Sequence, residues 1–141
     1  MNPNESLGHA FALMSRLLER ELRRGLSEYA VTPGQLPVLL ALYERDGQTQ
    51  TELAGTVGVE QPTMAATLTR MERDGLVRRE LDADDGRRVG VFLTRAAVRL
   101  EKPLTDTVRV ANRRALRGLS GDERSLLYGL TERLRANLER A

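Results

Sequence analysis

The sequence QTELAGTVGVEQPTMAATLT, residues 50–69, decides the fold of this 141-residue chain. Its first half favours a helix up to Gly58, where glycine permits the positive φ that ends a helix. A second helix is predicted from Pro62, because proline suits the first turn. Ala54 is small enough for the two helices to cross closely, and Met64 is expected to pack back onto the first one. This spacing indicates a helix-turn-helix, with a helical hairpin used only for packing as the alternative.

A β-hairpin is expected after the second helix, which should end at Asp74. The period of the apolar residues changes there from about 3.6 residues to about 2. This change predicts strands over Val77 to Leu81 and Val89 to Leu93, joined by the polar residues 82–88. A helix-turn-helix followed by a hairpin is a winged helix-turn-helix, and we predict this lobe for residues 32–94.

Amphipathic helices are also expected before the helix-turn-helix. Apolar residues recur every three or four positions from Leu7 to Tyr29, which predicts one long helix. The stretch Thr32 to Gln35 has the spacing of a capping box, and it predicts a helix with proline at its first position that continues through Tyr43. A second capping box, Thr49 to Glu52, begins the helix-turn-helix itself.

Two further helices are predicted after the hairpin. Thr94 caps a helix whose apolar residues repeat about every 3.5 residues, as in a helix packed along another helix, and Pro103 should bend it. Ser120 to Glu123 is a third capping box and begins the last helix. The inward residues of that helix are predicted to be Leu126, Leu127, Leu130, Leu134 and Leu138.

The resulting fold class is mainly α (α+β), a single domain over residues 1–141. The apolar stripes of the terminal helices exceed what a lobe of this size can cover, so a partner chain is expected to complete the core. We therefore assign residues 5–30 and 95–141 to a helical dimerisation region, and we expect a homodimer.

Composition excludes several classes of protein. The chain has no cysteine and one histidine, so disulfides, thiolate sites and multi-histidine zinc sites are excluded on one chain. No nucleophile–base pair is recognisable either, so we expect no enzyme and no cofactor. The longest apolar stretch is far shorter than the roughly 20 residues of a membrane span, and no secretory signal is recognisable. A cytoplasmic protein without a membrane partner is expected.

The outward face of the second helix is the predicted contact with double-stranded DNA. Gln61 can pair with adenine through two hydrogen bonds, while small side chains can contact thymine methyl groups. Arginine and threonine side chains at its edges suit phosphate. The predicted contacts are Gln61, Pro62, Thr63, Ala65, Ala66, Thr69, Arg70 and Arg73. The alternative is that the same fold binds another protein, which salt-dependent binding to duplex DNA would distinguish.

The hairpin loop is the second predicted contact. Arg87 and Arg88 lie at its tip, and an arginine there can enter a narrow minor groove. Acidic residues lie beside them, and we expect Asp85 to hold an arginine in place through a bidentate ion pair. A solvated hairpin of mixed charge is the alternative, since residues 61–90 contain six arginines and six acids.

The segment Asp85-Gly86-Arg87, followed five residues later by Leu93-Thr94, resembles the wing signature of the multiple-antibiotic-resistance regulator (MarR) family. Glu72 to Arg79, Val31 to Leu36 and Glu52-Leu53-Ala54 also match its pattern. The resemblance implies a homodimeric winged-helix regulator that binds a palindromic operator, usually as a repressor relieved by a ligand. It further implies that Arg87 is the minor-groove arginine, that Asp85 anchors it, and that Gln61 to Arg70 is the recognition helix.

The site of a small-molecule effector stays open at this stage. Residues 94–118 carry seven basic and two acidic residues, which would suit an acidic ligand or flanking DNA. The alternative is a solvated face paired with acids of the last helix, namely Glu123, Glu132 or Glu139. Aromatic residues could border an effector cavity or belong to the core, and these are Tyr29, Tyr43 and Phe92.

Overall fold

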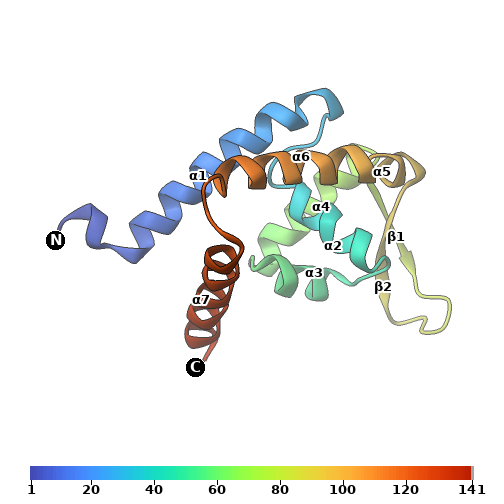
Figure 1. The fold of residues 1–141 in the computed structure, drawn as a ribbon. Coiled ribbons are helices and arrows are strands. Elements are labelled where there is room, and N and C mark those ends of the chain that lie inside the picture. The colour runs from blue at the N-terminus through green and yellow to red at the C-terminus, as the bar shows by residue number, and fades with distance from the viewer. Residues whose placement is uncertain (141) are drawn as a thin grey trace.

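Two long helices cross beside a small lobe from which a β-hairpin extends (Figure 1). The computed structural model describes residues 1–140, which are mainly helical and contain one two-stranded antiparallel sheet. The predicted fold class, a winged helix-turn-helix with long helices at both ends, is confirmed. The elements in chain order are η1 (Pro3–Glu5), α1 (Leu7–Leu26), η2 (Ser27–Tyr29), α2 (Leu36–Glu44), α3 (Gln50–Val57), α4 (Gln61–Arg73), β1 (Val77–Leu81), β2 (Val89–Leu93), α5 (Arg95–Arg99), α6 (Glu101–Ala115) and α7 (Gly121–Glu139), where η denotes a 3₁₀ turn.

The helix-turn-helix forms where the sequence predicts it. Both hydrogen bonds of the Thr49–Glu52 capping box are present at the start of α3, and α3 ends at Gly58 with a φ of 80°. Met64, Leu68 and Met71 of α4 are buried, as expected from their helical spacing. The hairpin has the predicted strands, in a register that pairs Val77 with Leu93.

The core lies between α2, α3, α4 and the hairpin, and it is closed by the end of α1 and the start of α6. Burial of these apolar side chains is the main force that holds the lobe together. Its largest fully buried residues are Leu26, Val38, Leu39, Leu42, Leu53, Met64, Leu68, Met71, Val91 and Leu104. The loop before α3 joins the sheet, because the Gly47 N–H donates to the Val91 carbonyl at 3.0 Å.

Two prolines explain where the predicted helices differ from the observed ones. Proline lacks an N–H and clashes with the carbonyl four residues earlier, so a regular helix accommodates it only in its first turn. Pro37 therefore prevents a helix from starting at Pro33, and α2 begins at Leu36 although the Thr32–Gln35 side-chain hydrogen bonds do form. Pro103 acts in the same way on the predicted bent helix after Thr94, which the structure divides at Leu100 into α5 and α6.

α1 and α6 cross at a glycine. A Cβ atom on Gly25 would lie 2.5 Å from Cγ2 of Thr107, which is too close for any other residue without a shift. Leu104 and Ala111, two positions of the predicted 3.5-residue seam, are buried on α6. Glu21 of α1 accepts a hydrogen bond from Arg114 of α6, and this contact lowers the pKa of the Glu21 carboxyl. Close packing and an ion pair thus join the two helices.

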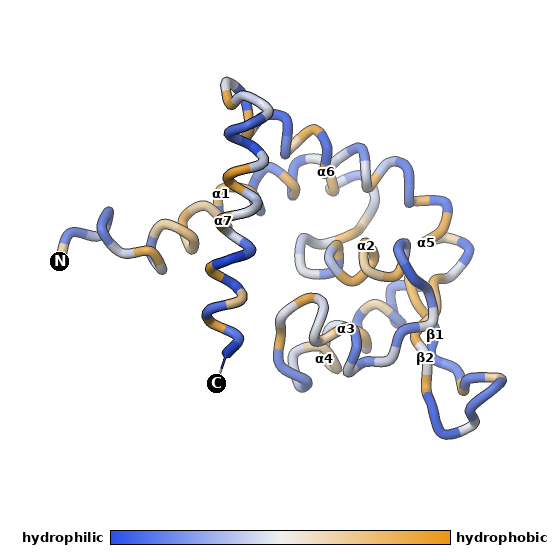
Figure 2. Tube along the Cα trace, turned by 60° about the horizontal axis from the view of Figure 1, so that its bottom comes forward, coloured by the Kyte–Doolittle hydropathy of each residue, from blue (hydrophilic) through white to orange (hydrophobic). Residues whose placement is uncertain are grey.

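α7 differs from the expectation, because its leucines do not face inward within the chain. Leu126 is 61% exposed and Leu130 is 44% exposed, and Figure 1 shows α7 leaving the end of α6 and running separately beside the lobe. Figure 2 shows hydrophobic segments on α7 and on the first half of α1. Phe11 and Met14 of α1 are among the exposed large apolar residues. No helix within residues 1–140 combines the length and the apolar character needed to cross a bilayer.

Candidate nucleic-acid interface

The outward face of α4 carries the predicted contact residues in exposed positions. Seven of the eight are exposed, and Ala65 is half-buried beside the core-facing row. The Thr69 hydroxyl donates to the Ala65 carbonyl at 3.0 Å, which leaves its methyl group as the free part of the side chain. The face is therefore small and largely neutral at its centre, as a contact with thymine methyl groups requires.

Gln61 at the start of α4 is held in place by α3. Its Nε2 donates to Oγ1 of Thr51 at 3.0 Å, and its Oε1 accepts from Nε2 of Gln50 at 3.1 Å. A primary amide has two donor hydrogens and two acceptor lone pairs, so one of each remains free. Adenine needs one donor and one acceptor, so the held amide retains what that base requires. Sequence reasoning missed Gln50 and Thr51, although their position at the start of α3 could have indicated them.

The two arginines of α4 differ in their surroundings. Nε of Arg73 lies 3.2 Å from Oδ1 of Asp74, whose other oxygen accepts from Nε2 of Gln35 at 2.9 Å. The Gln35 hydrogen bond, followed by that of Arg73, lowers the pKa of the Asp74 carboxyl. Within residues 1–140 no carboxylate lies within 4.0 Å of the Arg70 guanidinium, so Arg70 is the better placed of the two for a phosphate.

The wing tip does not contain the predicted bidentate ion pair. Oδ1 of Asp85 accepts from the backbone N–H of Arg87 at 3.1 Å, and no ion pair joins Asp85 to an arginine in the described residues. An aspartate that bonds the N–H two residues on is typical of a tight turn, and the short loop favours this local contact. Asp85 thus orders the backbone that carries Arg87, whose side chain is exposed.

Arg88 is also placed differently from the expectation of a free arginine at the tip. Its Nη2 lies 2.5 Å from Oε1 of Glu52 on α3, and its Nε lies 3.5 Å from Oδ2 of Asp82. Arg45 contacts the other oxygen of Glu52 at 2.6 Å. The hydrogen bond from Arg45, with further bonds from Thr49 and the charge of Arg88, lowers the pKa of Glu52 to about 2.

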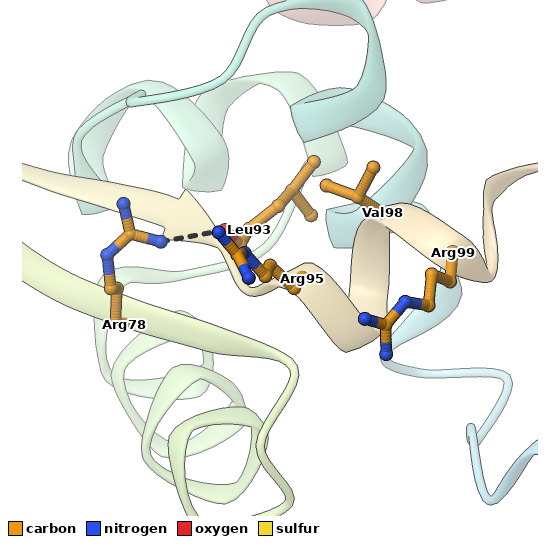
Figure 3. Close-up of a pocket in the computed structure, with 5 residues that line it drawn as sticks. All are labelled: Arg78, Leu93, Arg95, Val98 and Arg99. Atoms are coloured by element: carbon orange, nitrogen blue, oxygen red, sulfur yellow. Dashed lines mark hydrogen bonds between the residues drawn. The ribbon is translucent and has the colours of Figure 1, made fainter.

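An open depression of about 620 Å³ lies at the base of the wing, between β2 and α5 (Figure 3). Nη1 of Arg78 donates to the Leu93 carbonyl at 2.8 Å, and its guanidinium lies 5.4 Å from the centre of the Phe92 ring. Arg95 and Arg99 lie one turn apart on α5, and neither has a carboxylate within 4.0 Å in residues 1–140. Nε of Arg78 also lies 3.2 Å from Oε2 of Glu80, so Arg95 and Arg99 are the two arginines of this lining without an acidic partner in the described part of the chain. Sequence reasoning missed this group of arginines beside Leu93 and Val98.

The aromatic residues that could have bordered an effector cavity lie apart from one another. The Tyr43 hydroxyl donates to the Ala97 carbonyl at 2.6 Å, and burial raises its pKa to about 12, so Tyr43 belongs to the core. Tyr29 lines a separate depression between α1 and α6. Phe92 of β2 packs its ring against Gly47 and Gly90.

The basic face of α6 does not pair with acids of the last helix, which was one of the two interpretations of this face. Arg114 contacts Glu21 of α1, and Nη1 of Arg109 lies 3.2 Å from Oδ1 of Asp106 on the same helix. Glu132 and Glu139 instead contact Arg135 within α7. The prediction was wrong because α7 projects away from α6 after Gly118. No group of three potential ligands in residues 1–140 could hold a metal ion.

Comparisons with known proteins agree with this geometry. The MarR family model matches residues 31–89. The transcriptional regulator PA3341 is 36% identical, with a TM-score of 0.85 over 96% of this chain and 100% of that one. The PcaV transcriptional regulator from Streptomyces coelicolor, in complex with its natural ligand, is 26% identical, with a TM-score of 0.85 over 99% of this chain and 98% of that one. A MepR–DNA complex from S. aureus has the same fold at 23% identity, with a TM-score of 0.85 over 99% of this chain and 100% of that one. Because the family model matches and a transcriptional regulator covered over its whole chain is 36% identical, the chain belongs to the MarR family of transcriptional regulators.

Proposed function

We propose that this protein is a homodimeric, ligand-responsive repressor that acts in the cytoplasm and binds a palindromic operator. The observation that carries the proposal is the exposed α4 face, on which Gln61 is held with one donor and one acceptor free. α4 enters the major groove, and Arg87 of the wing enters the flanking minor groove. The MepR structure shares the fold and is described as a complex with DNA, which supports DNA as the partner.

The dimer is supported by the apolar residues that the single chain leaves exposed on α1 and α7. In a two-fold dimer both copies use the same surface, so the apolar stripe of one copy packs against the apolar stripe of the other. Leu7, Phe11 and Met14 of α1 and Leu126 and Leu130 of α7 belong to this surface. Pairing through the terminal helices leaves both copies of α4 free for one DNA duplex.

Selection of a duplex from random sequence tests the proposal directly. The selected site should contain two inverted half-sites with centres about 10 base pairs apart, because both recognition helices must reach one face of the DNA. Insertion of five base pairs between the half-sites turns one of them away and should weaken binding strongly. Unchanged affinity for that rotated site would contradict the arrangement. Binding should also weaken with added salt, whereas a protein-binding module selects no duplex at all.

The wing contact is tested by two alanine variants. Arg87→Ala removes a charge-assisted contact from each half of the dimer, and each contact contributes about 1–3 kcal/mol. Operator affinity should therefore fall roughly 30- to 10⁴-fold. Asp85→Ala should also weaken binding, although it removes a negative charge, because Asp85 orders the backbone of Arg87. Asp84→Ala is the matched control, and tighter binding by both aspartate variants would show that these carboxylates only repel DNA.

The ligand is expected to be a small organic acid that binds at the base of the wing. Arg95 and Arg99, which have no acidic partner in residues 1–140, can hold a carboxylate, while Leu93 and Val98 contact its apolar part. PcaV, which has the same fold, is described with its natural ligand. A panel of aromatic and aliphatic acids should contain compounds that release the selected duplex from the native protein. Arg95→Gln and Arg99→Gln should abolish that release, and release at native concentrations in both variants would exclude this site.

A further inference from the structure

We propose that Glu52 and Arg88 form a clamp that fixes the wing, residues 77–93, against the helix-turn-helix. Arg88 is then a positioning residue for Arg87 and makes no DNA contact of its own. The inference deepens the proposed function and rests on it, because it concerns how the wing reaches the operator. It is carried by contacts between residues that lie far apart in the sequence.

Glu52 is the fixed half of the clamp. Its Oε1 accepts from the Thr49 N–H at 3.4 Å and from Oγ1 of Thr49 at 3.1 Å, while its own N–H donates to Oγ1 of Thr49 at 3.1 Å. The capping box therefore orients the carboxylate at the start of α3. α3 packs directly against the recognition helix α4, so a group held to Glu52 is held relative to α4.

Arg88 is the wing half of the clamp, and it directly precedes β2. Its guanidinium contacts Glu52 at 2.5 Å and Asp82, at the other side of the loop, at 3.5 Å. Its carbonyl accepts from the Asp82 N–H at 2.7 Å. The Arg88 side chain is only 33% exposed, whereas neighbouring Arg87 is an exposed residue. One guanidinium thus joins α3 to both sides of the loop that presents Arg87.

No other side chain of residues 82–88 bonds to α3 in the part of the chain that the structure describes. The base of the hairpin is attached separately, since the Val91 N–H donates to the Gln48 carbonyl at 2.8 Å. Loss of the clamp should therefore leave β1 and β2 paired but loosen residues 82–88, including the hydrogen bonds that the Asp82 and Arg88 amides donate within the loop. If the wing occupies its DNA-binding position for only a fraction of the time, the apparent affinity for DNA is reduced by that fraction.

Glu52→Gln and Arg88→Gln test the clamp in the full-length protein. Glutamine keeps the capping box at position 52 but loses the charge that holds Arg88. Each single variant should bind the duplex selected by the native protein about tenfold more weakly, as for a wing competent about a tenth of the time. The double variant should bind no more weakly than either single one, because both remove one interaction.

The sign of the Glu52→Gln effect separates the clamp from a direct DNA contact. If Arg88 contacted phosphate independently of Glu52, removal of the Glu52 carboxylate near DNA should strengthen binding. The effects of Glu52→Gln and Arg88→Gln on affinity would then add in the double variant. Arg45→Gln is the matched control, since Arg45 contacts the same carboxylate at 2.6 Å but lies outside the wing. It should weaken binding less than Arg88→Gln. Hydroxyl-radical footprints of the clamp variants should lose protection at the flanking minor grooves alone.

Amide hydrogen exchange provides a test without DNA. The amides of Asp82 and Arg88 should exchange faster in Glu52→Gln and Arg88→Gln than in the native protein, with native circular dichroism, and Arg45→Gln should remain native-like. Native exchange in both clamp variants, or tighter DNA binding by Glu52→Gln, would overturn the clamp. A native protein that selects no duplex would overturn the proposed function alone, because the exchange measurement still decides the clamp.

Discussion

Apolar residues are buried in the winged lobe and exposed on the terminal helices. In the lobe, Leu53 and Leu68 are fully buried by neighbours from the same chain. On α7, Leu126 and Leu130 lie four positions apart, as the buried Met64 and Leu68 do on α4, but remain 61% and 44% exposed. The amphipathic period of a helix therefore identifies its apolar face. It does not indicate whether the same chain or another copy would cover that face.

The difference also separates two tasks in the proposed regulator. The lobe holds the DNA-reading side chains through contacts within the chain, such as those around Gln61 and Glu52. In the proposed dimer, the terminal helices of the two copies set the distance between the two lobes. Substitutions in the two regions should therefore have different signatures.

The largest effect is expected from a charge on the exposed stripe of α7. Leu130→Glu places a carboxylate in the proposed dimer surface of both copies, and an unpaired charge buried in an apolar contact is strongly unfavourable. The variant should sediment as a monomer or unfold at micromolar concentration. Ala136→Glu, on the opposite face of α7, is the control and should remain dimeric. A native chain that is itself a stable monomer would contradict the comparison.

A cavity in the lobe should destabilise the protein without separating the copies. Leu68 is fully buried on α4, and Leu68→Ala should lower the free energy of unfolding by about 2–5 kcal/mol. Its dimer dissociation constant, measured by sedimentation, should stay native. Leu126→Ala should show the reverse, with weaker dimerisation as its main effect. If Leu68→Ala and Leu126→Ala raised the dimer dissociation constant equally, the lobe and the terminal helices would not differ in the way proposed.

Most elements of the fold follow from local sequence signals. The strands were predicted to the residue because the period-2 pattern and the polar loop are local, and the α3 capping box formed as expected. The start of α2 at Leu36 was the error, and its cause is local as well, because Pro37 clashes with the carbonyl four residues earlier in a helix. The bend predicted from Pro103 is present as the break at Leu100 between α5 and α6.

The candidate site was predictable only in part. The exposure of α4 and of Arg87 follows from periodicity and from the loop position. The contact of Arg88 with Glu52 does not, because it depends on how the hairpin lies against α3. The bidentate pair predicted for Asp85 failed since a closer partner, the N–H of Arg87, was available in the turn. Sequence spacing identified the charged groups but not which partner each one takes.

The capping boxes allow a smaller and matched test of the two regions. Thr49 and Ser120 each accept from the N–H of a glutamate three residues later, at 3.1 Å in both cases. Alanine at either position should cost about 1 kcal/mol. Thr49→Ala should appear in the unfolding of the lobe, and Ser120→Ala in helix content and dimerisation, measured by denaturant titration and sedimentation. Thr49→Ser and Ser120→Thr keep the acceptor and should remain near native.

The smallest effect is expected from the acid titration of Glu52. Its pKa is lowered from 4.5 to about 2, chiefly by the Arg45 hydrogen bond, so the folded state favours the ionised form. A carboxyl whose pKa is lower in the folded state than in the unfolded state stabilises the fold at pH values above its unfolded pKa. This contribution disappears as the pH falls through the folded pKa. The native denaturant midpoint should therefore decline between pH 4.5 and about 2. Glu52→Gln lacks this titration, and Arg45→Gln removes its main cause, so both variants should decline less over the same range. An identical decline in all three proteins would show that Glu52 contributes nothing to the acid sensitivity of the lobe.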